Sequence, residues 1–215
     1  MASYDAGLAP PRVQILVEKL MQPNEQILSA KLLCKHRGTL TEYRMQYRRF
    51  DGSTGEMSRE IYDRGSAASV LLHNPDRDTV VLVRQFRPSP LVNGTKPYLI
   101  EACAGALDGD SPDSCAVREA YEETGLRVEG LRRICAAYVN PAALTEVITM
   151  FIGFYDGAQP VSQTGGVADE GEDIEVLEMP FDEAYSKIGS GEIVDMKTII
   201  LLQALMIERL SSIVS

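Results

Sequence analysis

The amino-acid sequence predicts an α/β fold in which strands surround one acidic helix, preceded by a small antiparallel β unit. Short segments rich in β-branched and aromatic residues recur along the chain, separated by turn residues, which is typical of strands. One segment, between Ser111 and Gly125, instead carries the start and stop signals of a helix. A length of 215 residues suffices for one α/β core with a small N-terminal addition.

Residues 1–63 are predicted to form the N-terminal β unit. Residues 1–10 are expected to be a loose tail, and residues 13–21 a strand or a short helix. The other expected strands are residues 27–34, 43–48 and 57–62, with a turn at residues 51–55 between the last two. The unit has too little apolar material for a core of its own. We therefore expect it to pack on the main domain or on a second subunit, as a dimerisation element.

Residues 64–215 are predicted to form the main domain. Its expected strands are residues 70–72, 80–86, 98–103, 134–139, 147–155 and 174–179. Residues 158–173 are polar and glycine-rich and are expected to be a loop, and residues 180–188 and 196–210 are expected to be helices.

The acidic helix has recognisable ends. Ser111 suits the N-cap, Pro112 suits the first helical position, and Gly125 suits the residue just past the last turn. On a helical projection an apolar stripe of Val117, Ala120 and Tyr121 lies roughly opposite three glutamates.

Glu119, Glu122 and Glu123 stand at spacings of three and four residues, which share one helix face. Three like charges on neighbouring turns repel each other unless a cation neutralises them. Hard cations such as Mg²⁺ prefer carboxylate oxygens and usually share their coordination with water and substrate phosphates. The pattern therefore favours metal-assisted chemistry on a phosphorylated substrate. An ordinary amphipathic helix with a solvated acidic face is the alternative.

The composition restricts the partners and the compartment. A formal net charge of -10 argues against nonspecific binding to nucleic acid or to a membrane surface. The four cysteines show no zinc-binding spacing, and Cys103 and Cys115 are expected to be small buried side chains. The chain shows no signal peptide and no apolar run of membrane-spanning length. A cytoplasmic protein with reduced thiols is therefore predicted.

The acidic segment resembles the signature of the Nudix hydrolase superfamily. Residues 118–126, Arg-Glu-Ala-Tyr-Glu-Glu-Thr-Gly-Leu, match the second half of that motif throughout. The first half departs from it, because four residues instead of five separate Gly105 from the acidic position, which is Asp110 instead of Glu. The resemblance implies an αβα sandwich with a mixed sheet.

Several further segments resemble the branch of nucleotide-sugar pyrophosphatases that includes the GDP-mannose and ADP-ribose pyrophosphatases. They are residues 59–65, 83–87, 92–94, 100–105, 170–176 and 195–198, and a Ser-Pro-Gly of the group is Asn140-Pro141-Ala142 here. The resemblance implies hydrolysis of the pyrophosphate bond of a nucleoside diphosphate sugar, with GDP-mannose as the expected substrate. ADP-ribose is the alternative substrate, and a non-catalytic sensor that binds a nucleotide sugar is the alternative class.

The resemblance also implies roles for individual residues. The expected ligands of a Mg²⁺ ion, or alternatively of Mn²⁺, are the Ala104 carbonyl, Glu119, Glu122 and Glu123, with Glu101 close by. The expected catalytic residues are Glu170 as general base, Glu172 as its support and Arg118 as the residue that orients a carboxylate. The expected substrate contacts are Arg84 and Arg87 at the diphosphate, Tyr62 at the base, and Glu101 and Pro141. For both arginines, and for the acidic tract at residues 169–173, simple solvated charge is the alternative. A homodimer that exchanges its N-terminal regions is expected.

Overall fold

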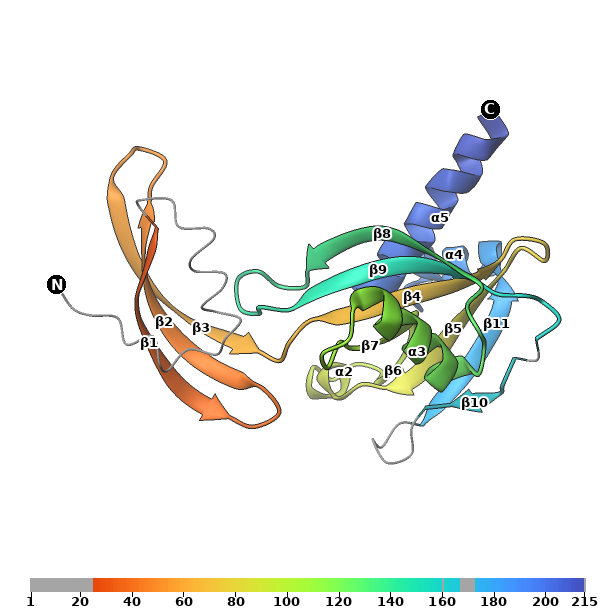
Figure 1. Ribbon diagram of the computed structural model, residues 1–215, viewed down its shortest axis with the longest axis horizontal. Coiled ribbons are helices and arrows are strands. Elements are labelled where there is room, and N and C mark those ends of the chain that lie inside the picture. The colour runs from red at the N-terminus through yellow and green to blue at the C-terminus, as the bar shows by residue number, and fades with distance from the viewer. Residues whose placement is uncertain (1–24, 160, 167–172, 215) are drawn as a thin grey trace. The chain divides into compact units, whose positions relative to one another are not determined.

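The computed structural model describes residues 25–159, 161–166 and 173–214. The predicted tail, the segment at residues 13–21, Glu170 and Glu172 lie outside these ranges. The chain divides into two compact units (Figure 1). One comprises residues 1–65 and 138–146, and the other comprises residues 66–137 and 147–215. The first unit thus also takes in a segment from the middle of the sequence.

The first unit contains a three-stranded antiparallel sheet in the order β1-β2-β3, formed by β1 (Gln26–Lys35), β2 (Thr39–Arg48) and β3 (Thr54–Asp63). The three strands predicted for this region are therefore confirmed. Asp51 stabilises the β2–β3 turn by accepting from the Ser53 N–H at 2.8 Å. The Tyr62 N–H, near the end of β3, donates to the Ala143 carbonyl at 2.8 Å, which attaches the segment at residues 138–146 to the sheet.

The second unit is built on a mixed eight-stranded sheet. Its main order is β10-β11-β5-β4-β9-β8, while β6 pairs with β5 and β7 pairs with β4. The β4–β9 pair is parallel, whereas β4–β5, β5–β11, β5–β6 and β4–β7 are antiparallel. The strands are β4 (Ala67–Asn74), β5 (Thr79–Phe86), β6 (Tyr98–Glu101), β7 (Cys103–Ala106), β8 (Gly130–Tyr138), β9 (Val147–Phe154), β10 (Thr164–Gly165) and β11 (Ile174–Pro180).

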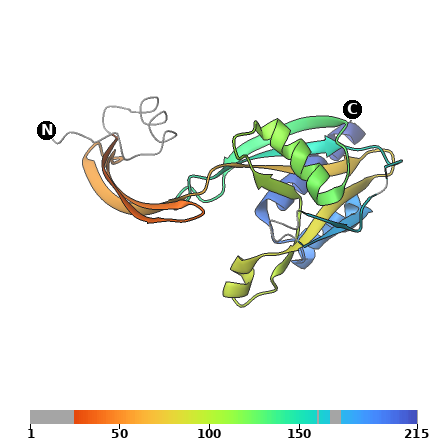
Figure 2. The same cartoon turned by 60° about the horizontal axis from the view of Figure 1, so that its bottom comes forward.

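Helices cover both faces of this sheet. The acidic helix α3 (Pro112–Thr124) packs on β4 and β7, whereas α4 (Phe181–Ser190) and α5 (Met196–Val214) pack on β11, β4 and β9 from the other side (Figures 1 and 2). This is the predicted αβα sandwich with a mixed sheet. A short helix, α2 (Pro88–Val92), was not predicted.

Small side chains on α3 allow the helix to lie close to the sheet. Ala116 and Ala120 are fully buried against a layer that includes Val70, Val83 and Phe151. Close packing of this kind fixes the position of α3, and with it the direction of every side chain that the helix carries.

The sequence prediction needs correction in two places. Residues 98–103 do not form one strand, because the chain changes its pairing partner at Ala102 and divides into β6 and β7. The loop predicted at residues 158–173 contains β10, which pairs with β11. Both differences arise from pairing with distant strands, which local sequence patterns do not encode.

Candidate active site

The ends of α3 are formed by the predicted residues. The Ser111 side chain accepts from the Ser114 N–H at 3.2 Å, and Pro112 occupies the first turn. Gly125 adopts a left-handed conformation with φ 75°, which glycine reaches without steric cost, and its N–H donates to the Tyr121 carbonyl. The acidic segment is therefore held in a well-terminated helix.

The buried face of α3 carries glutamates as well as small side chains. Val117 and Tyr121 are 42% and 54% exposed, whereas Glu119 and Glu123 are only 8% and 1% exposed. The sheet is therefore met by small residues and by these two carboxylates, and not by Val117 and Tyr121 of the apolar stripe. Burying carboxylates is costly unless cations or hydrogen bonds compensate them. The alternative of a solvated acidic face does not fit this arrangement.

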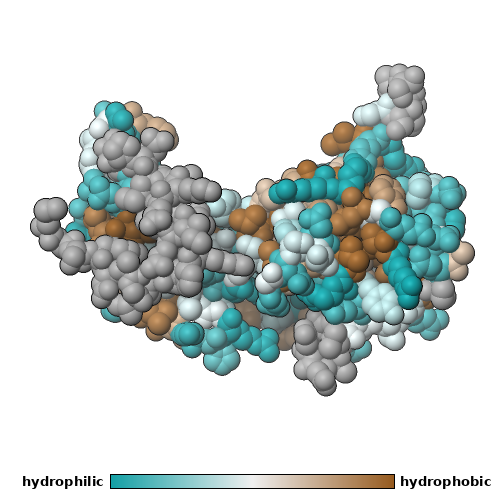
Figure 3. Space-filling view, viewed as in Figure 1, coloured by the Kyte–Doolittle hydropathy of each residue, from teal (hydrophilic) through white to brown (hydrophobic). Residues whose placement is uncertain are grey.

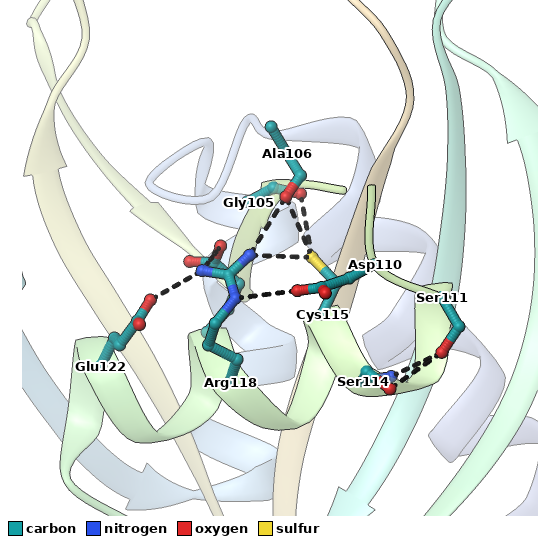
Figure 4. A network of polar contacts seen from close by, with 9 residues as sticks. Gly105, Ala106, Asp110, Ser111, Ser114, Cys115, Arg118 and Glu122 are labelled. Carbon is teal, nitrogen blue, oxygen red and sulfur yellow. Dashed lines mark hydrogen bonds and ion pairs between the residues drawn. The ribbon is translucent and has the colours of Figure 1, made fainter. Parts of the chain in front are cut away.

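Arg118 ties the helix to the preceding loop. Its Nη1 lies 2.8 Å from Glu119 Oε1 and 2.8 Å from Glu122 Oε2 (Figure 4). Its Nε donates to Asp110 Oδ2 at 3.3 Å, and its Nη2 donates to the Ala106 carbonyl at 3.2 Å. These carboxylates raise the pKa of Arg118 above its ordinary value, although burial acts in the opposite direction. Arg118 therefore stays charged and holds two glutamates in fixed orientations.

Gly105 provides the space for the Glu119 carboxylate. A Cβ atom at position 105 would lie 1.8 Å from Glu119 Oε1, a distance that no side chain could tolerate. Gly105 lies in β7 beside Ala104, so the carboxylate sits directly against the backbone of that strand. The Glu119 carboxylate thereby lies close to the backbone of β7, whose carbonyl groups are also hard oxygen donors.

A second carboxylate lies beneath the same strand. Burial raises the pKa of the Cys103 thiol well above its usual value, and the hydrogen-bonded carboxylate of Glu123 raises it further. Cys103 is therefore a neutral thiol next to Glu123, and Cys115 is also buried. The expectation that both cysteines are small buried side chains is confirmed.

Arg87 and Glu101 form a pair at the end of β5 and β6. Arg87 donates to Glu101 Oε2 from Nε at 2.9 Å and from Nη2 at 2.6 Å. Burial lowers the pKa of Arg87, but the Glu101 carboxylate and, less strongly, Glu123 raise it to a net value above the ordinary one. Glu123 thus acts on the pKa of Arg87, the phosphate-binding candidate, as well as on the pKa of Cys103.

Arg84 forms a more exposed ion pair than Arg87 does. Its Nη1 donates to Glu175 Oε2 in the neighbouring strand at 2.7 Å, and both side chains are substantially exposed. A contact of this kind contributes little to stability.

Residues 195–198 also contact the Arg87–Glu101 pair, although no role was predicted for them. Lys197 Nζ lies 3.5 Å from Glu101 Oε1 and 3.0 Å from Asp195 Oδ1, and its side chain is only 9% exposed. The signal was present as an Asp-Met-Lys-Thr segment at the start of a helix, but its partner is 96 residues away from Lys197 in sequence.

The structure also describes the predicted site residues Tyr62, Pro141 and Ala104. Tyr62 and Pro141 belong to the first unit, where the Tyr62 carbonyl accepts from the Thr145 N–H at 3.2 Å. Ala104 lies in β7 opposite Ser69 of β4.

The donor set around α3 suits a divalent cation. Glu119 and Glu123 are buried carboxylates on adjacent turns, and Glu122 is half-buried beside them. Because Gly105 has no side chain, the Glu119 carboxylate can lie close to the backbone of β7. Oxygen donors of this type are those that Mg²⁺ and Ca²⁺ prefer. Within residues 25–159, 161–166 and 173–214, no three acidic, histidine or cysteine side chains converge on one point as they stand, and Arg118 contacts two of the three glutamates.

The fold is an αβα sandwich with a mixed sheet, and the acidic helix α3 places two buried glutamates beside the strand β7. The Nudix domain model matches residues 63–197, and the chain belongs to the Nudix family. Members of this family act with a divalent metal. The prediction of a Nudix hydrolase is therefore confirmed, and the alternative of a non-catalytic sensor is not supported.

Similar proteins extend over most of the chain. GDP-mannose pyrophosphatase from Cronobacter sakazakii is 45% identical over 186 residues, which cover 86% of this chain and 96% of that protein. GDP-mannose pyrophosphatase from Klebsiella pneumoniae is 44% identical over 193 residues, covering 89% and 96%. GDP-mannose pyrophosphatase from Escherichia coli O1:K1 is 44% identical over 185 residues, covering 86% and 96%. The resemblance to the nucleotide-sugar pyrophosphatase branch is thereby confirmed.

Among the described residues, no helix is both long enough and apolar enough to cross a lipid bilayer.

Proposed function

We propose that this protein hydrolyses the pyrophosphate bond of GDP-mannose and releases GMP and mannose 1-phosphate. The observation that carries the proposal is its 44–45% identity, over nearly the full length of both chains, to proteins named GDP-mannose pyrophosphatase. The buried glutamates of α3 and the Arg87–Glu101 pair supply the chemistry that such a reaction requires.

The metal in this proposal is Mg²⁺, with Mn²⁺ as an alternative. Glu119, Glu122, Glu123 and the Ala104 carbonyl would hold it. Bound there, the cation would neutralise the diphosphate and lower the pKa of the attacking water. Arg118 keeps Glu119 and Glu122 oriented through its two contacts of 2.8 Å.

Arg87 and Arg84 bind the diphosphate in this proposal. A guanidinium group has a planar array of donors that matches phosphate oxygens. Arg87 is already oriented by Glu101, while the exposed Arg84 can exchange Glu175 for a phosphate oxygen. Water then attacks one phosphorus atom, the bridging P–O bond breaks, and a carboxylate accepts the proton of the water. Glu170 is proposed as that base, with Glu172 as its support.

We also propose a homodimer that uses the first unit. Among its described residues, Tyr43 is the one large side chain that is buried, whereas Leu28, Leu32 and Leu33 are 38–57% exposed. Apolar patches appear on this sheet in the space-filling view (Figure 3). Burial against a second copy would remove this surface from water. In this proposal Tyr62 and Pro141 of the first unit contact substrate in the dimer. The four free cysteines suit a reducing, cytoplasmic compartment.

The experiment is to measure nucleoside monophosphate release from GDP-mannose, ADP-ribose, UDP-glucose and NADH, with Mg²⁺ and with EDTA. EDTA-sensitive release of GMP from GDP-mannose at the highest kcat/KM supports the proposal. A preference for ADP-ribose would replace the substrate and leave the chemistry intact.

Matched variants test the metal ligands. Glu119→Gln removes one charge at nearly constant volume and is expected to lower kcat by about 10²–10³-fold, as loss of a major charge-stabilising group does. Glu129→Gln, which lies after α3 outside the cluster, is the control and should keep its activity. Full activity in Glu119→Gln would contradict the assignment of Glu119 as a metal ligand.

A further inference from the structure

The backbone between β6 and β7 is bonded to the first turn of α5. Up to Glu101 the chain pairs with β5, and from Cys103 onward it pairs with β4, so Ala102 stands between the two ladders. The Ala102 N–H donates to Thr198 Oγ1 at 2.7 Å, and both residues are buried. A buried N–H needs an acceptor, and here a side chain supplies the one that a strand would otherwise provide.

Asp195 fixes the orientation of the Thr198 hydroxyl. Asp195 Oδ2 accepts from Thr198 Oγ1 at 2.5 Å and from the Thr198 N–H at 3.0 Å. Because a hydroxyl has one proton and that proton goes to Asp195, its lone pairs are left to accept from Ala102. Asp195 therefore caps the start of α5 and aims the hydroxyl at the strand break with the same oxygen. Its other oxygen, Oδ1, contacts Lys197.

Parts of the candidate site lie on both sides of Ala102. Before it, Glu101 receives both donors of Arg87 and lies 3.5 Å from Lys197. After it, Gly105 forms the close-fitting wall against which the Glu119 carboxylate rests. A shift of the backbone at Ala102 would move both groups, because each is only one to three residues away.

We propose that Thr198 and Asp195 are positioning residues for the active site. They anchor the β6–β7 segment to α5 and so set the placement of the Arg87–Glu101 pair and of the strand that receives Glu119. The inference rests on the metal site proposed above. It adds that the N-terminal turn of α5, which contributes no atom to the metal, determines how tightly the metal binds.

The test uses the full chain and the substitution Thr198→Val, which keeps the shape and removes the hydroxyl. The expected results are at least tenfold faster hydrogen exchange at the Ala102 amide, followed by NMR, and a several-fold weaker Mn²⁺ affinity, measured by electron paramagnetic resonance without substrate. A lower kcat is expected at saturating GDP-mannose. Thr198→Ser keeps the hydroxyl and should restore all three.

Thr79→Val is the matched control. It removes a hydroxyl that contacts Tyr155 and Glu178 at the opposite end of β5, so it should alter stability without altering Mn²⁺ affinity or Ala102 exchange. A folded Thr198→Val protein with wild-type exchange at Ala102 and wild-type Mn²⁺ affinity would overturn the proposal. So would a Thr79→Val protein that loses Mn²⁺ affinity equally.

A second variant covers the case in which Thr198→Val does not fold. Asp195→Asn retains a helix-capping side chain but weakens the acceptor for Thr198 and the contact with Lys197. It should shift Ala102 exchange and Mn²⁺ affinity in the same direction, and no shift in either would overturn the proposal. If the proposed metal site itself is wrong, the wild-type protein will bind no Mn²⁺. Hydrogen exchange at the Ala102 amide would still test the hydrogen bond to Thr198, so the two failures are distinguishable.

Discussion

Replacing Gly105 by alanine should separate the stability of this protein from its catalysis. The new Cβ atom would lie 1.8 Å from Glu119 Oε1 and 2.0 Å from Glu119 Cδ. An ordinary contact needs about 3.4 Å, so the carboxylate must retreat by about 1.6 Å, the difference between 3.4 and 1.8. The obstacle is the end of a flexible side chain and not the backbone, so Glu119 can move while the fold persists.

The expected costs follow from that displacement. Overpacking at a buried site typically costs about 1–3 kcal/mol, and the lower end applies here because one side chain can rotate away. Misplacing a catalytic group by about 1 Å can cost about 10²-fold in rate. Gly105→Ala should therefore unfold within a few degrees of the wild type and yet lose about 10²-fold or more in kcat, with weaker Mg²⁺ activation.

The assay combines thermal unfolding with GMP release from GDP-mannose over a range of Mg²⁺ concentrations. Gly189→Ala is the control, because a Cβ atom there meets open space and the residue lies within α4. It should keep full activity and gain about 0.5–1 kcal/mol in stability, as glycine-to-alanine changes in helices do. The reasoning is refuted if Gly105→Ala keeps wild-type activity and metal dependence.

Three further predictions concern side chains outside α3. Arg87→Lys keeps the charge but cannot direct two donors at Glu101 Oε2, so KM for GDP-mannose should rise about tenfold in steady-state kinetics; an unchanged KM would remove Arg87 from the substrate site. Burial lowers the pKa of His73, so below a pH of about 6.5 the unfolded chain binds more protons at this residue than the folded chain, and the free energy of unfolding should decrease as the pH falls. Thermal unfolding of His73→Gln should show a smaller decrease over the same pH range. Iodoacetamide, with mass spectrometry to locate the label, should modify the exposed Cys34 long before the buried Cys103, whose raised pKa disfavours the thiolate; labelling of Cys103 first would contradict this.

The parts of the fold that sequence predicted well are those that local chemistry determines. The caps of α3 depend on Ser111 and Gly125, which act on their immediate neighbours, and both occupy the predicted positions. The strands β2 and β3 follow from alternation of side chains along a short segment. The family motif then supplied the sandwich architecture, which no local pattern specifies.

The parts that sequence did not reveal depend on contacts between distant segments. The direction of α3 cannot be read from its apolar stripe, because the sheet accepts the small Ala116 and Ala120 together with two glutamates. The break at Ala102 requires Thr198, a residue 96 positions later, whose hydroxyl replaces a strand partner. Only the folded chain brings such a donor and acceptor together.

The contacts of Arg118 resolve the electrostatic problem that the sequence posed. Glutamates at spacings of three and four residues repel each other on a bare helix, and a metal ion alone seemed necessary to offset this. In the structure the guanidinium already contacts Glu119 and Glu122, so α3 can fold with its acidic face assembled before any cation binds. Asp110 joins the same guanidinium from the preceding loop, where the family motif has a glutamate. The shorter aspartate thus still reaches Arg118 and contacts the guanidinium that Glu119 and Glu122 also contact. If a divalent cation binds to Glu119 and Glu122, as proposed above, it must compete with Arg118 for both carboxylates, and we then expect its affinity to depend on the arginine as well.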